Sequence, residues 1–513
     1  MLNPAVAQKL QIFALCLGGL LLAVFLGTQI GESKYGPLLL GALVVVVASV
    51  SLFSGGFFWV LTIASSFLGG TFPILGGSFT PFQILMAIGV AKFVVTDTVL
   101  KRTRIQRPAR ADLLMIIAFM AIITLHGVHD RFGMKFLGSS VWGGRNYINV
   151  YVGLAAFFII QSVPMKPKLW SKLPYVVLAV TIFDVAVAVV TTIFPASIYK
   201  IYPFYSAVST IAFEEITTGS PSETDRIGGF GSLGFILVIL VLASVPLYQI
   251  LSLQNLKRSF IFIAGSIAVL YSGFRSAVFN TSLAILSAGI RDLKWGVLVL
   301  APIIAVLLFG LSFINSEVVT LPKQVQRALA FLPGKWDPLM ARDAASSNQF
   351  RELVWTTWTR EYFPVHPWLG RGFGFNSRWG ERPVYKNDPY ATIQTIETGN
   401  IHNGFLASLD TFGIVGTIFF VIWNLRLLGQ ALQVPFRRKH PEDMALRFVA
   451  LYLAVAIVSY WIGAQHVGTF LPQQFALAGV FLRLRKTLES DSIAAPSSTP
   501  TLDHRLPQKP ARA

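Results

Sequence analysis

The stretch that decides the fold is Ile401-His402-Asn403-Gly404-Phe405-Leu406-Ala407-Ser408-Leu409-Asp410, which continues into Thr411-Phe412-Gly413-Ile414-Val415-Gly416. A histidine stands here at the junction between a long polar segment and an apolar helix. Residues 316–401, which precede it, are rich in charge, aromatic side chains, Gly and Pro, whereas the chain after it is apolar to about Leu428. The junction therefore predicts a membrane helix with a titratable side chain at its mouth.

The composition of the whole chain indicates a membrane protein. Of its 513 residues, 54% are hydrophobic and only 13% are charged, and the mean hydropathy is +0.62. A soluble chain carries about 25% charged residues. The long continuous apolar runs exclude a transmembrane barrel, which is built from alternating segments of about 10 residues. We expect an all-α polytopic membrane protein of about 12–14 transmembrane helices, with one large external loop that carries short helices.

The distribution of Lys and Arg between these helices predicts their orientation. The loops rich in Lys and Arg alternate with poorer ones, which places both termini in the cytoplasm and the loops 196–228 and 316–401 outside. We interpret the apolar run after Lys9 as a retained first helix rather than a cleaved signal peptide. The expected spans are residues 10–30, 37–53, 57–75, 79–96, 111–127, 146–164, 173–195, 229–251, 258–274, 276–290, 295–315, 403–428, 445–463 and 468–483.

The net charge of +18 is dispersed among the loops, so we expect no nucleic-acid partner. The single cysteine, Cys16, excludes an intrachain disulfide.

The expected spans and loops divide the chain into six parts. The parts are N-terminal transmembrane helices at 1–195, an external loop at 196–228, central transmembrane helices at 229–315, the large external loop at 316–401, C-terminal transmembrane helices at 402–486 and a disordered cytoplasmic tail, rich in Ser, Pro and Ala, at 487–513.

The large external loop combines charge with aromatic side chains. It holds ten basic and eight acidic residues, and five of the eleven tryptophans of the chain. Residues 347–363 have the pattern of an amphipathic helix, which Pro364 and Pro367 end. One interpretation is an interfacial helix with an aromatic belt. The other is a lid that stacks on sugar rings and closes over a substrate, and the two are compatible.

Glycines recur in His366-Pro367-Trp368-Leu369-Gly370-Arg371-Gly372-Phe373-Gly374, within the same loop. Their spacing is similar to that of phosphate-binding loops, but the Lys-Ser/Thr pair of a P-loop and the strand–helix setting of a dinucleotide fold are missing. We interpret these glycines as turn formers that let the backbone approach a ligand or a helix.

Two arginines on the outer side are candidates for binding an anion. Arg275 lies between two expected spans, and Arg226 lies just before another. Arginine near hydrocarbon is costly and therefore a functional candidate. A guanidinium group suits a diphosphate, to which it donates two parallel charge-assisted hydrogen bonds. The alternative is that these side chains reach out to lipid headgroup phosphates.

His402 is the candidate general base, because an unperturbed histidine titrates at a pKa of about 6.5, near working pH. The alternative is a histidine that caps a helix at the membrane interface. For Asp184 and Lys92, inside expected spans, packing with a polar partner is the favoured role. The sequence contains no HExxH, no CxxC and no Asp-x-Asp pair in an external loop. We therefore expect no metal and no cofactor.

Four segments, in this order, resemble the O-antigen ligase and O-antigen polymerase superfamily of bacterial integral membrane glycosyltransferases. The resemblance covers about residues 200–430, and the N-terminal spans match only in hydrophobicity. The segments are Arg226-Ile227-Gly228-Gly229-Phe230-Gly231-Ser232, Ser272-Gly273-Phe274-Arg275-Ser276, the stretch from Arg351 to Gly374, and His402-Asn403-Gly404-Phe405-Leu406 with Gly413 and Gly416.

The resemblance implies a donor glycan carried on undecaprenyl diphosphate in the outer leaflet of the bilayer. It also implies an acceptor hydroxyl, on a glycan or on a lipid A-core, which His402 would activate. The implied donor or diphosphate contacts are Arg226, Arg275, Arg351 and Arg371. The implied acceptor or sugar contacts are Asn403, Trp355, Trp358 and Trp368.

The expected function is metal-independent, inverting glycan transfer in cell-surface polysaccharide assembly. Ligation and polymerisation use the same chemistry and differ only in the acceptor, so both stay open, as does glycan transfer to a protein hydroxyl. A bicarbonate-like transporter is the non-enzymatic alternative, but it would place its buried charges near the bilayer midplane, whereas these cluster on the outer side. The expected location is the bacterial inner membrane, with the large loop in the periplasm.

Overall fold

The computed structural model of the protein describes residues 56–74, 77–94, 108–134, 137, 139–163, 166–208, 229–376, 378–379, 390–436, 442–463 and 467–494. Within these ranges the chain is almost entirely helical, which confirms the expected all-α class of polytopic membrane protein. The strands form two antiparallel pairs, β1 (Phe72–Ile74) with β2 (Gly77–Phe79) and β3 (Val141–Trp142) with β4 (Phe375–Asn376).

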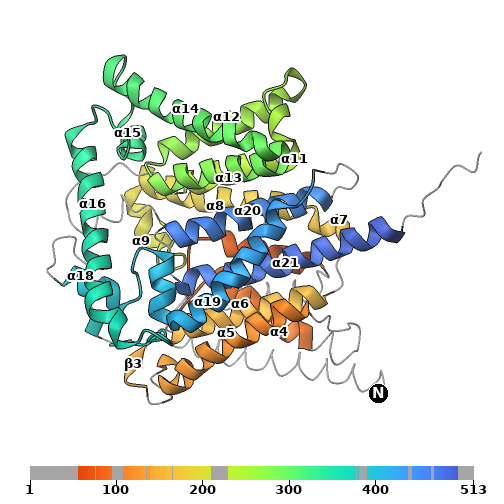
Figure 1. The fold of residues 1–513 in the computed structure, drawn as a ribbon, viewed down its shortest axis with the longest axis vertical. Helices are drawn as coiled ribbons and strands as arrows, with labels where there is room; N and C mark the ends of the chain where they lie inside the picture. The colour runs from red at the N-terminus through yellow and green to blue at the C-terminus, as the bar shows by residue number, and fades with distance from the viewer. Residues whose placement is uncertain are drawn as a thin grey trace, which may run out of the picture.

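The long helices lie side by side in one bundle (Figure 1). By length and composition, five helical stretches in the described part of the chain are able to cross a membrane: Arg110–His129, Lys168–Ile193, Arg275–Glu317, Gly404–Leu432 and Asp443–Ile462. The bundle helices are α5 (Arg110–His129), α6 (Gly144–Ser162), α8 (Leu173–Ile193), α11 (Phe230–Ser244), α12 (Leu256–Tyr271), α13 (Arg275–Leu293), α14 (Val297–Glu317), α19 (Gly404–Leu432), α20 (Glu442–Ile462) and α21 (Val467–Ala494).

Several sequence boundaries differ from the structure. The expected spans 276–290 and 295–315 correspond to α13 and α14, which are joined by only the short turn Lys294–Gly296. The expected spans 57–75 and 79–96 contain the short helices α3 (Phe57–Ala64) and α4 (Pro81–Lys92). Helix α21 continues to Ala494, past residue 487, where the sequence placed the start of the tail. The expected spans 10–30 and 37–53 lie outside the described residues.

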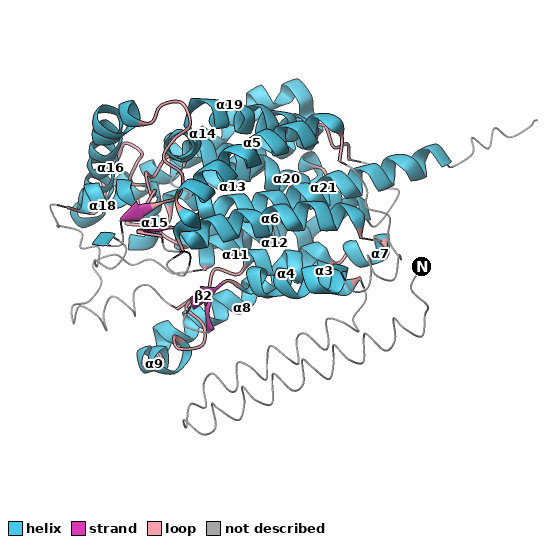
Figure 2. Cartoon of the chain, turned by 90° about the horizontal axis from the view of Figure 1, so that it is seen from below, coloured by secondary structure: helices cyan, strands magenta, loops and turns pink. Residues whose placement is uncertain are grey.

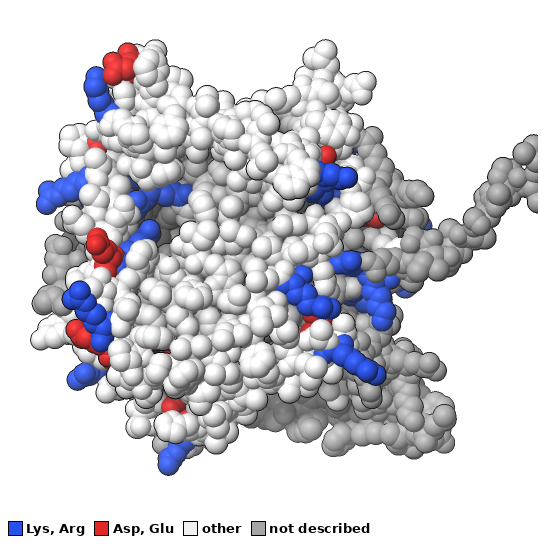
Figure 3. Space-filling view, viewed as in Figure 1, with Lys and Arg blue, Asp and Glu red and all other residues white. Residues whose placement is uncertain are grey.

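Charged side chains gather at the two ends of the bundle, and the face between them is almost free of charge (Figure 3). At one end, α16 (Pro338–Thr357) runs across the ends of the bundle helices, and α15 (Lys323–Leu329) and α18 (Ala391–Glu397) lie near it (Figures 1 and 2). At the other end, α21 leaves the bundle. This distribution fits a bilayer whose normal lies along the bundle, with α16 on one of its surfaces.

Aromatic rings fill the centre of the bundle where α6, α19, α20 and α21 meet. Phe157, Phe420 and Phe475 are each at most 1% exposed, and Tyr460 stacks on Phe470 with ring centroids 4.2 Å apart. Small residues bring the helices together, because a Cβ at Gly153 of α6 would lie 2.6 Å from the Cα of Pro472 in α21. This packing fixes α19, which leads from the outer loop into the bundle.

Helix α19 is broken at Gly413, whose backbone has φ 63° and ψ −172°. A break frees backbone N–H and C=O groups, and lipid offers them no partners. The backbone of residues 366–374 supplies the missing partners on both sides of the break. The four hydrogen bonds run from Arg371 N to Asp410 O (2.8 Å), from Gly372 N to Thr411 O (3.1 Å), from Ile414 N to Pro367 O (2.8 Å) and from Val415 N to Trp368 O (3.1 Å).

Glycine is needed on both sides of this contact. A Cβ at Gly413 would lie 2.3 Å from the carbonyl carbon and oxygen of Trp368. A Cβ at Gly370, whose φ is 76°, would lie 2.5 Å from the backbone N of Gly413. The glycines of the 366–374 segment therefore let the backbone approach a helix, which is one of the two partners that the sequence predicted for them.

We predict that Gly413→Ala destabilises the protein, because this φ and ψ combination is essentially restricted to glycine and costs other residues about 1–3 kcal/mol before any clash is counted. Thermal unfolding of the purified protein in detergent measures the effect. Gly429→Ala in the same helix is the matched control, since no atom lies within 4 Å of its Cβ position. Equal unfolding temperatures for the two variants would contradict the account of the break.

Candidate functional site

His402 lies in the short turn between α18 and α19 and has φ 57°, which non-glycine residues rarely adopt. The backbone on either side of it is held in place. The indole Nε1 of Trp355 donates to the carbonyl oxygen of Ile401 (2.9 Å), and Asn403 caps α19 by accepting from Leu406 N at its Oδ1 (3.1 Å). The capping role that the sequence left open for His402 therefore belongs to Asn403. Strained backbone of this kind concentrates at functional sites.

The surroundings of His402 favour the neutral imidazole. Its ring meets Phe350 of α16 edge-on, with centroids 6.2 Å apart. Burial lowers the pKa of His402 below its ordinary value, and the positive charge of Arg351 lowers it further. A neutral imidazole near pH 7 is able to accept a proton, as a general base must.

Helix α16 contacts both Arg275 and His402, through Asn348 and Phe350, and carries Arg351. Arg275 begins α13, and its Nη1 donates to Oδ1 of Asn348 on α16 (3.2 Å). Arg351, one turn further along α16, interacts electrostatically with both Arg275 and His402. Helix α16 therefore brings together two guanidinium groups and an imidazole from three separate parts of the chain.

The turn before Arg275 is fixed by Arg327 of α15, which the sequence did not single out. Arg327 is 6% exposed and donates to the carbonyl oxygen of Gly273 (2.8 Å) and to Oδ2 of Asp343 (2.7 Å). It thereby ties the start of α13 to α15 and α16 and binds an acid that also acts on Arg275. Its position in the charged outer loop was visible in the sequence, but its partners were not.

Arg371 binds protein groups rather than facing an open site. Its Nη2 lies 2.8 Å from Oδ2 of Asp410, its Nε lies 2.9 Å from both oxygens of that carboxylate, and its Nη1 donates to the carbonyl oxygen of Glu397 (3.0 Å). Burial acts to lower the pKa of Arg371, but the carboxylates of Asp410 and Glu397 outweigh it and raise that pKa above its ordinary value. The guanidinium group therefore stays charged and joins α18 to α19.

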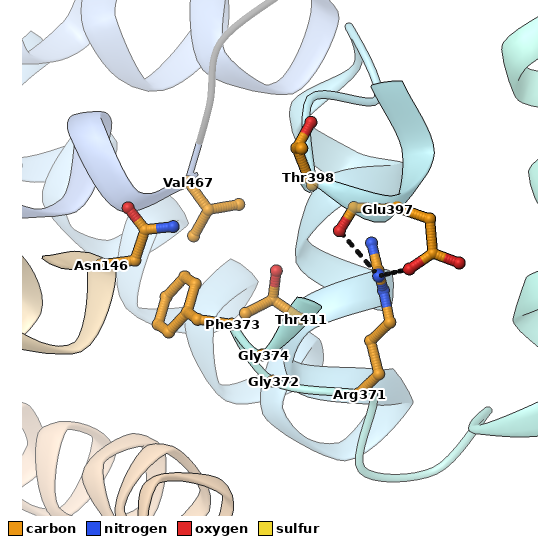
Figure 4. Close-up of a pocket in the computed structure, with 10 residues that line it drawn as sticks. Asn146, Arg371, Gly372, Phe373, Gly374, Glu397, Thr398, Thr411 and Val467 are labelled. Atoms are coloured by element: carbon orange, nitrogen blue, oxygen red, sulfur yellow. Dashed lines mark hydrogen bonds and ion pairs between the residues drawn. The ribbon is translucent and has the colours of Figure 1, made fainter. Parts of the chain in front are cut away.

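Figure 4 shows the small pocket beside this arginine, with Arg371 pointing toward Glu397. Its volume is about 10 Å³, which is close to the space that one water molecule occupies. No sugar or diphosphate fits into it. The segment 370–374 is therefore a packed part of the scaffold.

The three tryptophans that the sequence suggested as sugar contacts have different environments. Trp358 is 2% exposed, and its Nε1 donates to Oδ1 of Asp410 (2.8 Å). Trp355 is half-buried and holds the turn at Ile401. Trp368 is 66% exposed. Of the three, Trp368 presents the most open ring, whereas Trp358 belongs to the packing around Asp410.

A cavity of about 400 Å³ in the outer loop has aromatic walls. It is lined by Tyr362, Trp379, Tyr390, Arg378 and Glu397, and the Arg378 guanidinium lies 4.6 Å from the centroid of the Trp379 ring. Burial, and then the charge of Glu397, raise the pKa of Tyr362 to about 12, so its hydroxyl stays protonated. The sequence analysis missed this group, although Arg378 and Trp379 are adjacent in the chain.

A second cavity, of about 450 Å³, lies between the bundle helices. Phe274 and Ser276, on either side of Arg275, line it, as do Gly229 and Ser232 at the start of α11. Its described lining residues are uncharged, and several carry hydroxyl or amide groups. Arg226, the other expected diphosphate contact, lies outside the described residues, three positions before Gly229.

Two other charges that the sequence noted lie apart from this site. Asp184 accepts from the backbone N of Gly69 (2.7 Å) and from the hydroxyl of Tyr205. Lys92 is 6% exposed, and its Nζ lies 4.9 Å from the centroid of the Phe58 ring. In the described part of the chain, no three His, Cys, Asp or Glu side chains come together in a group suited to a metal ion.

Residues 260–421 match the family described as O-Antigen ligase. The matched region runs from α12 into α19 and includes Arg275, Arg351, His402 and the helix break at Gly413. The match confirms the resemblance to the O-antigen ligase and polymerase superfamily and supports a glycosyltransferase-like membrane enzyme. No curated protein matches the chain.

We predict that Asp410→Asn strongly destabilises the protein. Removing one partner of a buried ion pair costs about 3–5 kcal/mol, and Glu397, whose carboxylate lies 3.5 Å from Nη1 of Arg371, offsets only part of the charge that is left. Glu317→Gln is the control, because its pair with Lys335 (2.8 Å) is exposed and such pairs contribute about 0–1 kcal/mol. Unfolding temperatures in detergent compare the two. If Asp410→Asn unfolds at the wild-type temperature, the pair does not hold the loop to the helix.

Proposed function

We propose that this protein transfers a glycan from undecaprenyl diphosphate to an acceptor hydroxyl during the assembly of a cell-surface polysaccharide. The observation that carries the proposal is the meeting of His402, Arg275 and Arg351 around α16. A neutral base and cationic groups that stabilise the leaving diphosphate are the two requirements of a transfer in which a hydroxyl attacks and a diphosphate leaves. The match to O-antigen ligases supports the same chemistry.

The proposed reaction is a single displacement at the anomeric carbon of the donor sugar. The acceptor hydroxyl gives its proton to the imidazole of His402 as its oxygen forms the new bond to that carbon. The bond from the carbon to the diphosphate oxygen breaks, and its electron pair stays on the diphosphate. Configuration at the carbon inverts because attack and departure take place on opposite faces. The mechanism needs no metal ion.

Arg275 and Arg351 are assigned the role of stabilising the negative charge that develops on the diphosphate. Fixed guanidinium groups stabilise that charge without reorganising at the moment of reaction. Arg226 is proposed as a further contact, because the sequence places it just before Gly229, which lines the cavity beside Arg275. Arg371 is left out of this set, since Asp410 and Glu397 occupy its donors.

The sugars are assigned to the aromatic cavity lined by Trp379 and Tyr390 and to the exposed ring of Trp368. Aromatic faces suit the apolar faces of sugar rings, and Glu397 and Arg378 offer partners for hydroxyl groups. Asn403 and Trp355 hold the turn of His402 and are proposed to act through it. In the proposed orientation this end of the bundle is periplasmic, both termini are cytoplasmic, and the membrane is the bacterial inner membrane.

We predict that His402→Gln lowers transfer about 10²–10⁴-fold, because the variant has no group to accept the proton of the acceptor. The measurements are surface glycan and lipid-linked donor in cells that carry the variant as their only copy. Surface glycan should fall and the donor should accumulate. His366→Gln, at an exposed histidine of the same loop, is the control and should behave as wild type. Normal surface glycan without donor accumulation in His402→Gln cells would refute the enzyme and favour the transporter.

We predict an acidic limb in the pH dependence of transfer that lies below pH 6.5. The base must be neutral, so the rate falls as pH drops through the pKa of His402, which burial and Arg351 lower. Arg351→Gln removes a like charge, so the pKa of His402 rises and the limb moves to higher pH. The measurement is kcat/KM of the purified protein as a function of pH.

Arg360→Gln is the control for this shift, because Arg360 is an exposed arginine just beyond α16. Its acidic limb should coincide with that of the wild type. An Arg351→Gln limb that stays in place, or one that moves equally in both variants, would show that His402 is not the group that titrates.

The acceptor distinguishes a ligase from a polymerase. In a deletion strain, loss of long chains with single repeat units still attached identifies a polymerase, and loss of all attached glycan identifies a ligase. Transfer to a protein hydroxyl would instead appear as missing glycoprotein with normal lipopolysaccharide. The proposed site would use His402, Arg275 and Arg351 with each of these acceptors.

A further inference from the structure

A basic cavity of about 350 Å³ lies at the end of the bundle opposite His402. Four basic side chains line it, namely Arg426 of α19 and Arg483, Arg485 and Lys486 of α21. Ligand pockets in proteins span about 300–1,000 Å³, so the cavity is large enough for a small polar group. Transfer chemistry at the other end of the bundle does not account for it.

Among the described lining residues, one acid accompanies these four bases. Asp112, in the first turn of α5, is 2% exposed and accepts from Nε of Arg426 at 2.9 Å. The ion pair joins α5 to α19 and fixes the position of Arg426. Among the described lining residues the formal charge is therefore positive, and the amide of Gln430 adds a neutral hydrogen-bonding group.

The cavity lies where α5, α19 and α21 reach the edge of the bundle, and Gln161 of α6 also lines it. It is bounded by the start of α5, the last turns of α19 and the part of α21 that leaves the bundle. Figure 3 shows Lys and Arg side chains gathered at this end, beside the face that is almost free of charge. With the bilayer normal along the bundle, a basic cavity at the border of the apolar face lies at the depth of lipid headgroups.

We propose that this cavity binds a phosphate group, supplied by the headgroup of an anionic phospholipid. Arginine donates paired hydrogen bonds to phosphate oxygens, and lysine adds a point charge. Basic pockets between membrane helices are known to bind anionic headgroups in this way. A soluble phosphate has the same chemistry and is the other possible source. The proposal is independent of the transfer reaction, because it concerns the opposite end of the bundle.

The test is thermal unfolding of the purified full chain in neutral detergent, titrated with phosphatidylglycerol, with phosphatidylcholine or with inorganic phosphate. We expect phosphatidylglycerol to raise the unfolding temperature and phosphatidylcholine not to. In Arg485→Gln/Lys486→Gln, the phosphatidylglycerol concentration needed for half of the effect should rise roughly fivefold for each charge removed.

The matched control is Lys168→Gln/Lys257→Gln, which removes two exposed lysines outside the cavity. It should keep the wild-type response. If Arg485→Gln/Lys486→Gln does not fold, Lys486→Glu at an exposed position carries the same expectation. Arg426 is left intact in all variants, because its loss would leave Asp112 buried without a partner.

The outcomes separate clearly. Protection by inorganic phosphate that the cavity variant loses would support a phosphate site with a soluble source. Protection by neither phosphatidylglycerol nor inorganic phosphate would overturn the proposal. An equal loss of protection in the cavity and control variants would also overturn it, because that result means that diffuse surface charge is responsible. Transfer activity that stays normal in the cavity variant leaves the proposed function untouched.

Discussion

The structure depends on a break in helix α19 that a loop repairs. At Gly413 the helix gives up backbone hydrogen bonds, and the segment around Gly370 supplies them from outside the helix. Because lipid offers no hydrogen-bonding partners, such a break persists only where protein replaces them. The backbone of the loop therefore completes the hydrogen bonding of the membrane helix.

The ion pair between Arg371 and Asp410 reinforces this contact. Asp410 precedes the break, and Arg371 from the loop binds its carboxylate while also donating to the carbonyl oxygen of Glu397 at the end of α18. His402 lies between Glu397 and Asp410 in the chain, so both helices that flank it are fixed by the same guanidinium group. This arrangement explains how a residue in a turn holds a backbone conformation that is costly in isolation.

Part of this was predictable from sequence and part was not. The apolar runs predicted the helical membrane class, and the position of His402 before such a run predicted a histidine at the mouth of a helix. Arg351 and Arg371 looked alike, because both are arginines of one loop. The pairing of Arg371 with Asp410 depends on the helix break at Gly413. A glycine inside an apolar run does not by itself predict that the helix breaks there. The burial of Trp358, which the sequence suggested as a sugar contact, was hidden for the same reason, since its partner is also Asp410.

The central claim is a division of labour in which His402 accepts the acceptor's proton and Arg275 holds the diphosphate. The most direct test is single-turnover transfer by the purified protein over a range of donor concentrations. The account predicts that His402→Gln slows the maximal rate with donor affinity unchanged, whereas Arg275→Gln weakens donor affinity as well as the rate. If His402→Gln reaches the wild-type maximal rate, or if Arg275→Gln binds the donor as tightly as wild type does, the account is contradicted.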